Sequence, residues 1–342
     1  MTPEERHRLF KQLEGYAIAG RFVLEELIGM GGMAAVFRAR QSNVNRQVAI
    51  KLIPADDPLL VARFEREAGM VSQLSHPNNV TMFDFGHTED GYVFLAMELL
   101  NGETLEQRIL RGPIPLETTL HIAEQLCHAL GEAHERGVVH RDVKPENIFL
   151  VAFQGDDAFV KVLDFGIAKS LDSRSYPSLT GEGRIIGTPR YMSPEQILGD
   201  DIDQRSDIYS LGCVLYQMLA GQPPFDAENS ATLMLKHAQD MPPEFSDVAP
   251  SRQVPKHIEG IVRRMLAKTP GDRPASLEFV RQELMTEVSP DTDRATSDVE
   301  TPNPRYHGDH RAVGRDDVPS DRGRRPTRVA SFDLDAASTR RG

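Results

Sequence analysis

The stretch that decides the fold reads His140-Arg141-Asp142-Val143-Lys144-Pro145-Glu146-Asn147, and Asp164-Phe165-Gly166 follows it after a strand-like run from Ala158 to Leu163. Phosphoryl transfer needs a carboxylate beside the attacking hydroxyl, a cation near the transferred phosphate, and an amide plus a second carboxylate to hold magnesium. These groups appear in that order as Asp142, Lys144, Asn147 and Asp164. An Asp or Asn taken alone in a polar loop is usually a turn former, but the ordered string indicates a phosphoryl-transfer site.

A glycine-rich hairpin is expected near the N-terminus, where Gly29-Met30-Gly31-Gly32-Met33-Ala34-Ala35-Val36 joins the strand-like runs 22–28 and 36–39. Glycines let backbone amides approach a triphosphate, and the side chain of Val36 can cover the face of an adenine. Ile28, Gly29 and Gly31 are therefore candidate nucleotide contacts. Taken alone, such a loop is equally consistent with a flexible turn.

An apolar run that ends in a cation, Val48-Ala49-Ile50-Lys51, is the next candidate element. A lone lysine at a strand end is usually solvated, but Glu67 gives this one a role. Asp57 can cap a helix that carries an apolar stripe, and Glu67 lies within that stripe. Because a buried carboxylate needs a partner, the sequence predicts that Glu67 pairs with Lys51 and aims it at the α- and β-phosphates of ATP.

These motifs together resemble the eukaryotic-like (Hanks-type) serine/threonine protein kinases of bacteria, from about Tyr16 to about Val288. The resemblance also covers these strings: Phe64-Glu65-Arg66-Glu67-Ala68, Gly187 to Glu195, Ser206 to Gly212 and Asp272-Arg273-Pro274. It implies an α+β, bilobal protein-kinase-like fold with ATP in the cleft. The expected parts are an N-terminal extension (1–15), a small β-rich N-lobe (about 16–97), a hinge (98–102), a larger α-helical C-lobe (about 103–288) and a disordered tail (289–342).

The resemblance also implies roles for single residues. Ala49 and Met97 are expected to line the adenine pocket, Met97 as gatekeeper, and Glu98 to Leu100 to form the hinge. Asp207 is expected to brace the catalytic loop, and Glu195 to pair with Arg273. The hydroxyl of Thr188 would bridge Asp142 and Lys144, an arrangement found when the acceptor is serine or threonine.

Two expectations concern regulation. Many bacterial relatives carry two threonines separated by one residue in the activation segment, whereas this chain reads Thr180-Gly181-Glu182. Arg141 and Lys169 are expected to form a basic pocket that orders this segment when Thr180 is phosphorylated. Glu182 would occupy part of that pocket permanently, although a merely solvated Glu182 is expected equally.

The acceptor preference and the tail give a further hypothesis. In kinases that prefer an arginine three residues before the acceptor, acids at the positions of Glu103 and Glu146 receive its guanidinium. The tail has an arginine three residues before Thr327 and another before Ser331, so both are candidate autophosphorylation sites. Simple solvation of this arginine-rich tail is the favoured alternative.

Composition agrees with a cytoplasmic enzyme. The 342 residues are 39% hydrophobic and carry a net charge of −12, with ten Arg and ten Asp or Glu after residue 289. No strongly basic footprint for nucleic acid is present, and no apolar stretch reaches membrane-spanning length. Cys127 and Cys213 are expected as buried thiols.

The sequence therefore predicts an ATP-dependent kinase with Mg²⁺, or alternatively Mn²⁺, as the metal. Its partners would be protein substrates with serine or threonine acceptors, and a second copy of the chain for autophosphorylation in trans. Two alternatives come from other classes: a catalytically inactive scaffold, which the intact Lys51, Asp142, Asn147 and Asp164 disfavour, and a small-molecule phosphotransferase.

Overall fold

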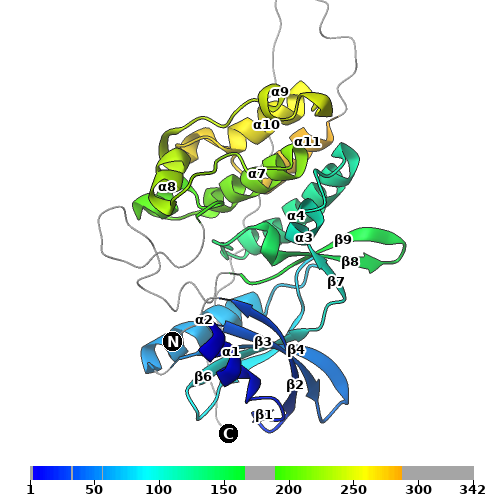
Figure 1. Ribbon diagram of the computed structural model, residues 1–342, viewed down its shortest axis with the longest axis vertical. Coiled ribbons are helices and arrows are strands. Elements are labelled where there is room, and N and C mark those ends of the chain that lie inside the picture. Colours follow the sequence, from blue (N-terminus) through cyan, green and yellow to red (C-terminus); the bar gives the residue numbers. More distant parts are fainter. Residues whose placement is uncertain (1–2, 32–33, 56, 166–188, 287–342) are drawn as a thin grey trace, which may run out of the picture. The chain divides into compact units, whose positions relative to one another are not determined.

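The computed structural model describes residues 3–31, 34–55, 57–165 and 189–286. The chain divides into two units, Met1–Val288 and Ser289–Gly342, and the second lies outside the described residues. The expectation of a disordered tail falls on that second unit. Within the first unit, a lobe built on a β-sheet precedes a lobe built mainly of helices, as the α+β bilobal prediction required (Figure 1).

The sheet of the N-lobe is antiparallel, and the strands of the described residues follow the order β1-β2-β3-β4-β6-β5. Its strands are β1 (Ala17–Ile18), β2 (Phe22–Gly31), β3 (Ala34–Gln41), β4 (Arg46–Pro54), β5 (Met82–His87) and β6 (Tyr92–Glu98). The described ends of the glycine-rich segment pair as strands β2 and β3, as predicted, with Gly31 opposite Ala34. Central strand β4 is buried from Val48 to Ile53 because side chains pack on both of its faces.

Helix α2 (Pro58–Val71) covers one face of this sheet. Asp57 caps it by accepting a hydrogen bond from the Leu59 amide at 2.9 Å, which confirms the predicted start. Phe64 and Ala68 on its apolar stripe pack in the same core as Val93 and Leu95 of β6. This packing stabilises α2 against the strand pair that carries Lys51 and the hinge.

Helix α1 (Pro3–Lys11) belongs to the segment expected as an extension before the N-lobe. Phe10 at its end is only 2% exposed and lies in a second core with Phe22, Phe37 and Phe94. Its ring centroid lies 6.5 Å from that of Tyr92. The chain therefore begins to contribute to the N-lobe core before the first strand.

The C-lobe of the described residues is organised around helix α7 (Gln204–Ala220), whose side chains are buried on nearly every side, and helix α4 (Leu116–Glu135) packs against it. The remaining elements are β7 (Gly102–Thr104), α3 (Leu105–Ile109), α4 (Leu116–Glu135), β8 (Ile148–Phe153), β9 (Asp156–Val162), α6 (Pro194–Leu198), α7 (Gln204–Ala220), α8 (Ser230–Gln239), α9 (Phe245–Val248), α10 (Lys256–Met265) and α11 (Leu277–Met285). Within the part of the chain that the structure describes, three short 3-10 helices span Pro145–Asn147, Pro250–Arg252 and Pro270–Asp272. Cys127 and Cys213 are buried free thiols, as predicted.

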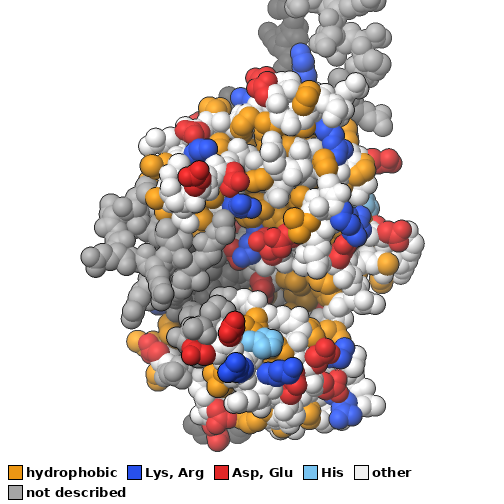
Figure 2. Space-filling model, in the orientation of Figure 1, with side chains coloured by type: hydrophobic (Ala, Val, Ile, Leu, Met, Phe, Trp, Pro, Cys, Tyr) orange, Lys and Arg blue, Asp and Glu red, His pale blue; other side chains and the backbone are white. Residues whose placement is uncertain are grey.

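The surface carries charges of both signs. Figure 2 shows Lys and Arg interspersed with Asp and Glu on the face drawn, rather than a single basic patch. Among the described residues, none of the helices combines the length and the apolar character that a membrane span requires.

Candidate active site

The catalytic loop connects helix α4 to strand β8 and holds Asp142 between two polar neighbours. The Asn147 Nδ2 atom donates to the Asp142 carbonyl at 2.9 Å and to Asp142 Oδ2 at 3.0 Å. Lys144 Nζ lies 3.0 Å from the same Oδ2. Burial opposes the charge on Lys144, but the Asp142 carboxylate outweighs it, so the pKa of Lys144 is raised and its ammonium is retained. Three residues of the predicted string are thus brought together.

The second predicted carboxylate lies beside this loop. The Leu163 amide donates to the Asn147 carbonyl at 2.8 Å, so Asp164 follows directly after a residue bonded to the loop. Asp164 has a φ of 53°, a left-handed conformation that is uncommon for a residue with a side chain. Such strained positions cluster at functional sites, where the surrounding contacts stabilise them.

An amide oxygen and a carboxylate suit Mg²⁺, which prefers oxygen ligands and is usually held by one or two protein groups together with phosphate oxygens. Asn147 turns its amide nitrogen toward Asp142, so its amide oxygen faces away and can accept a cation. Among the described residues, no group of three His, Cys, Asp or Glu side chains could hold a metal alone. Asn147 and Asp164 therefore fit a metal ion whose other ligands come from the phosphates of a nucleotide.

Lys51 does not make the predicted ion pair with Glu67. Its Nζ atom lies 2.7 Å from Asp164 Oδ1, whereas the Glu67 carboxylate has Arg66 as its ion-pair neighbour, at 4.0 Å. Among the ion pairs of the described residues, none joins Lys51 to Glu67. The expected pairing is wrong for this conformation because a short charge-assisted contact with Asp164 already satisfies the buried ammonium.

The adenine-pocket candidates share one face of the N-lobe sheet. Val36 lies opposite Lys51 in the β3–β4 pair, and Ala49 lies opposite Met97 in the β4–β6 pair. Directly opposite residues share a face, and so do residues two apart on a strand, so Lys51 and Ala49 bring all four side chains to the same side. Of the hairpin candidates, Gly29 lies opposite Val36, while Ile28 and Gly31 sit on the same strand. Glu98 ends β6, and Leu100 follows in the connection to β7.

Asp207 braces the catalytic loop, as predicted. Its fully buried carboxylate accepts hydrogen bonds from the amides of His140 and Arg141, both at 2.8 Å. His134 Nε2 lies 2.8 Å from the same carboxylate. Burial acts to raise the pKa of Asp207, but these partners, His134 foremost, lower it below the ordinary value. A charged Asp207 therefore fixes the backbone next to Asp142.

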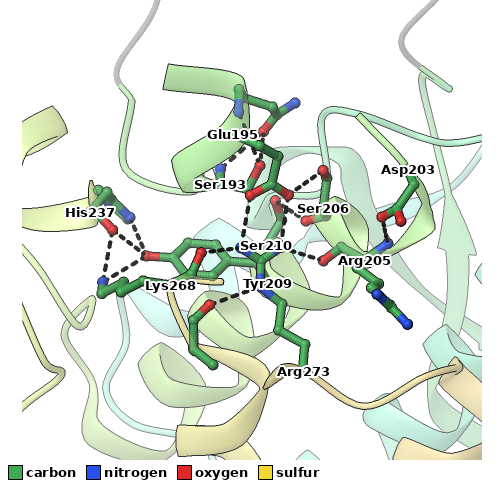
Figure 3. A network of polar contacts seen from close by, with 12 residues as sticks. Ser193, Glu195, Asp203, Arg205, Ser206, Tyr209, Ser210, His237, Lys268 and Arg273 are labelled. Carbon is green, nitrogen blue, oxygen red and sulfur yellow. Dashed lines mark hydrogen bonds and ion pairs between the residues drawn. The ribbon is translucent and has the colours of Figure 1, made fainter. Parts of the chain in front are cut away.

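The predicted pair of Glu195 and Arg273 is confirmed, and Figure 3 shows its surroundings. Two guanidinium nitrogens of Arg273 lie 2.7 and 2.8 Å from the two Glu195 oxygens, and Ser206 donates to the same carboxylate. Burial acts to raise the pKa of Glu195, but the Arg273 hydrogen bond and charge lower it. The pair anchors helix α6, from which Gln196 donates to the Arg141 carbonyl at 2.9 Å. This link to the catalytic loop gave no signal in the sequence.

Glu103 and Glu146, the two acids expected to receive an arginine of the acceptor sequence, lie in different environments. Glu103 accepts from Arg108 Nε at 2.7 Å and also from Arg111, so two guanidinium groups of the same chain already engage it. Burial raises the pKa of Glu146 above its ordinary value.

Four regulatory or bridging candidates, Lys169, Thr180, Glu182 and Thr188, lie outside the described residues. Their roles, and the pocket expected to involve Arg141, stay predictions.

Comparison with known proteins decides the family, because the protein kinase domain family matches residues 22–285, a span that includes every element of the site. The chain belongs to the protein kinase domain family. Membership implies the use of ATP and a divalent metal cation. Helix α1 lies outside the matched span of this kinase domain.

Three relatives of the kinase domain come from bacteria, as the sequence motifs predicted. It is 43% identical over 275 residues to the serine/threonine-protein kinase pkn3 of Myxococcus xanthus, covering 79% of this chain and 50% of the relative. It is 38% identical over 283 residues to the serine/threonine-protein kinase PrkC of Bacillus subtilis, covering 82% and 42%. With the serine/threonine-protein kinase PknB of Mycobacterium leprae it shares 36% identity over 278 residues, covering 78% and 43%. The chain thus spans half or less of the length of these relatives.

Proposed function

We propose that this chain is a serine/threonine protein kinase that transfers the γ-phosphoryl group of Mg-ATP to protein hydroxyls. The observation that carries the proposal is the contact of Asp142 with both Asn147 and Lys144, beside Asp164. A serine or threonine acceptor is supported by the names of the relatives, each a serine/threonine-protein kinase.

The residues have distinct tasks in this reaction. Asp142 orients the acceptor hydroxyl and accepts its proton, while Lys144 neutralises charge on the γ-phosphate. Asn147 and Asp164 would hold Mg²⁺, which screens the charge of the phosphate oxygens when it is bound. Lys51 holds the α- and β-phosphates, and Thr188 bridges Asp142 and Lys144. Most of the acceleration comes from positioning and electrostatics, because such a site forms no covalent intermediate.

Nucleotide recognition follows from the shared sheet face. Val36, Ala49 and Met97 cover the adenine, and the backbone from Glu98 to Leu100 pairs with its edge. Ile28, Gly29 and Gly31 cover the phosphates from the hairpin.

Autophosphorylation in trans accompanies this function, with a second copy of the chain as partner. Its expected acceptors are Thr180 in the activation segment and, in the tail, Thr327 and Ser331. Arg108 and Arg111 already pair with Glu103, so this acid is occupied. We therefore expect no strong preference for arginine in the acceptor sequence. We further propose a cytoplasmic location, Mg²⁺ rather than Mn²⁺ as the working metal, and no nucleic-acid partner.

The test is transfer of labelled γ-phosphate by the purified chain. We expect label on serine or threonine of the chain itself and of a generic unfolded protein, and none on small alcohols or aminoglycosides. Asp142→Asn is the matched control and should lower the rate by about 10² to 10⁴-fold. Labelling of small alcohols alone would favour the small-molecule phosphotransferase. Nucleotide binding without any transfer would favour the inactive scaffold.

A further inference from the structure

An ion pair joins the end of the N-lobe sheet to the strand that leads into Asp164. Lys161 Nζ of strand β9 lies 2.7 Å from Glu98 Oε1, where β6 ends. Their side chains are 13% and 25% exposed, so solvent and salt screen this contact less than an ion pair on the open surface. None of the phosphoryl-transfer motifs includes Lys161.

The pair lies within a set of backbone contacts made by residues 78–81, the segment before β5. The Thr81 amide donates to Glu98 Oε1 at 2.7 Å, and the Glu98 amide donates to the Thr81 carbonyl at 3.0 Å. The Val80 amide donates to the Val162 carbonyl at 3.0 Å, and the Val162 amide donates to the Asn78 carbonyl at 2.7 Å. Segment 78–81 is therefore hydrogen-bonded both to the hinge end of β6 and to β9.

The Asn78 side chain extends these contacts into the C-lobe. Its Nδ2 atom donates to the Val160 carbonyl and to Gln125 Oε1 of helix α4, each at 2.8 Å. Gln125 Oε1 also accepts from the Val160 amide at 2.8 Å. Strand β9 is thus hydrogen-bonded both to Gln125 of α4 and to segment 78–81, and Lys161 adds the direct charged link to Glu98.

Each residue of the ion pair lies close in the sequence to a group expected to bind the nucleotide. Glu98 begins the hinge, whose backbone faces the adenine edge, and Lys161 stands three residues before Asp164, the carboxylate of the metal site. A change in the separation of β6 and β9 would move the adenine contacts relative to Asp164. The nucleotide would then make one of the two sets of contacts less well, so its affinity would fall.

We propose that Lys161 and Glu98 form a positioning pair that sets the separation of the hinge from Asp164 and thereby determines nucleotide affinity. This inference rests on the proposed function for the identity of the ligand. Lys161 acts through Glu98 and the strand, and it touches neither the nucleotide nor the acceptor. Removing its charge leaves the half-buried Glu98 carboxylate without its charged partner, which favours a wider and more variable separation.

The experiment measures ADP binding by calorimetry in the presence of Mg²⁺, together with kcat and KM for ATP. Lys161→Met should raise the Kd for ADP and the KM for ATP by about 10-fold, with kcat within about twofold of the parent. Lys161→Arg keeps the charge and should restore most of the affinity. In the double variant Lys161→Met/Glu98→Gln, the loss of ADP affinity should be clearly smaller than the product of the two single losses. The reason is that the two substitutions remove the same ion pair.

Arg281→Met is the matched control, since Arg281 pairs with Glu278 and Glu124 within the C-lobe and should leave the Kd for ADP at the parental value. Parental affinity in Lys161→Met overturns the inference, as do losses that multiply in the double variant or a loss that Lys161→Arg fails to restore. Failure of the parent chain to bind ADP would overturn the proposed function as well. Binding without transfer would overturn the proposed function alone.

Discussion

Lys51 Nζ lies 2.7 Å from Oδ1 of Asp164, so the cation expected to hold phosphates and the carboxylate expected to hold the metal neutralise each other. In the proposed function, nucleotide binding replaces this contact with a phosphate oxygen for Lys51 and a metal for Asp164. The pair keeps two opposite charges oriented in the site, and each charge offsets part of the desolvation cost of the other.

Lys51→Met should lower autophosphorylation by orders of magnitude, because it removes a charge that stabilises the phosphates in the transition state. Substitution leaves Asp164 partly exposed, so the change in melting temperature should be small. Labelling rates and thermal melts of the two proteins check this. Near-parental activity of Lys51→Met would show that the lysine has no role in transfer.

Glu182 is expected to support basal activity. In a Thr180→Ala background, Glu182→Ala should lower the basal transfer rate severalfold, because a permanent acid would no longer order the activation segment. Rates toward an external protein substrate give the measurement, with Glu182→Asp as the conservative control. An unchanged rate in Glu182→Ala means that the side chain is merely solvated.

Arg273→Met should destabilise the fold by about 3–5 kcal/mol, because it leaves the buried Glu195 carboxylate without its charged partner. Urea unfolding measures the difference. The control is Arg190→Met, which breaks an exposed ion pair with Asp226 and should cost less than about 1 kcal/mol. Equal effects of the two substitutions would contradict the buried environment of Arg273.

Phe10→Ala should destabilise the N-lobe by about 3–5 kcal/mol, the usual range for deleting a fully packed aromatic side chain. The adjacent Leu9 is 42% exposed, so Leu9→Ala should be nearly neutral. Thermal or urea unfolding of both variants separates the two outcomes. If both variants unfolded like the parent, helix α1 would not be part of the N-lobe core.

Burial and the nearby charge of Lys268 lower the pKa of His237 to about 3. When the pH is below about 6.5, the ordinary pKa of histidine, this side chain binds a proton in the unfolded chain but stays neutral in the native chain. Stability should therefore fall as the pH drops from about 6.5 toward 3, by at most about 1.4 kcal/mol per pH unit. His237→Gln should flatten this dependence in urea unfolding between pH 6.5 and 4.5, whereas His87→Gln, at an exposed ring, should keep the parental slope.

The sequence by itself determined the elements whose signals are local. Successive side chains of a strand point to opposite faces, so Ala49 and Lys51 of β4 share one face. The helix cap at Asp57 depends only on the residues next to it. The order of Asp142, Lys144 and Asn147 within one short loop fixed their proximity, since a few residues of chain cannot separate them far. Family membership followed from the same ordered motifs.

Only the tertiary structure decided which carboxylate Lys51 contacts, and that Phe10, Glu103 and Lys161 have the partners described. Each of these contacts depends on how elements distant in the sequence pack, and a side chain such as lysine can reach acids on several of them. Strand period and loop length fix the direction of a side chain. Its partner is selected by the packing of α2, β6 and β9, to which many residues far along the chain contribute.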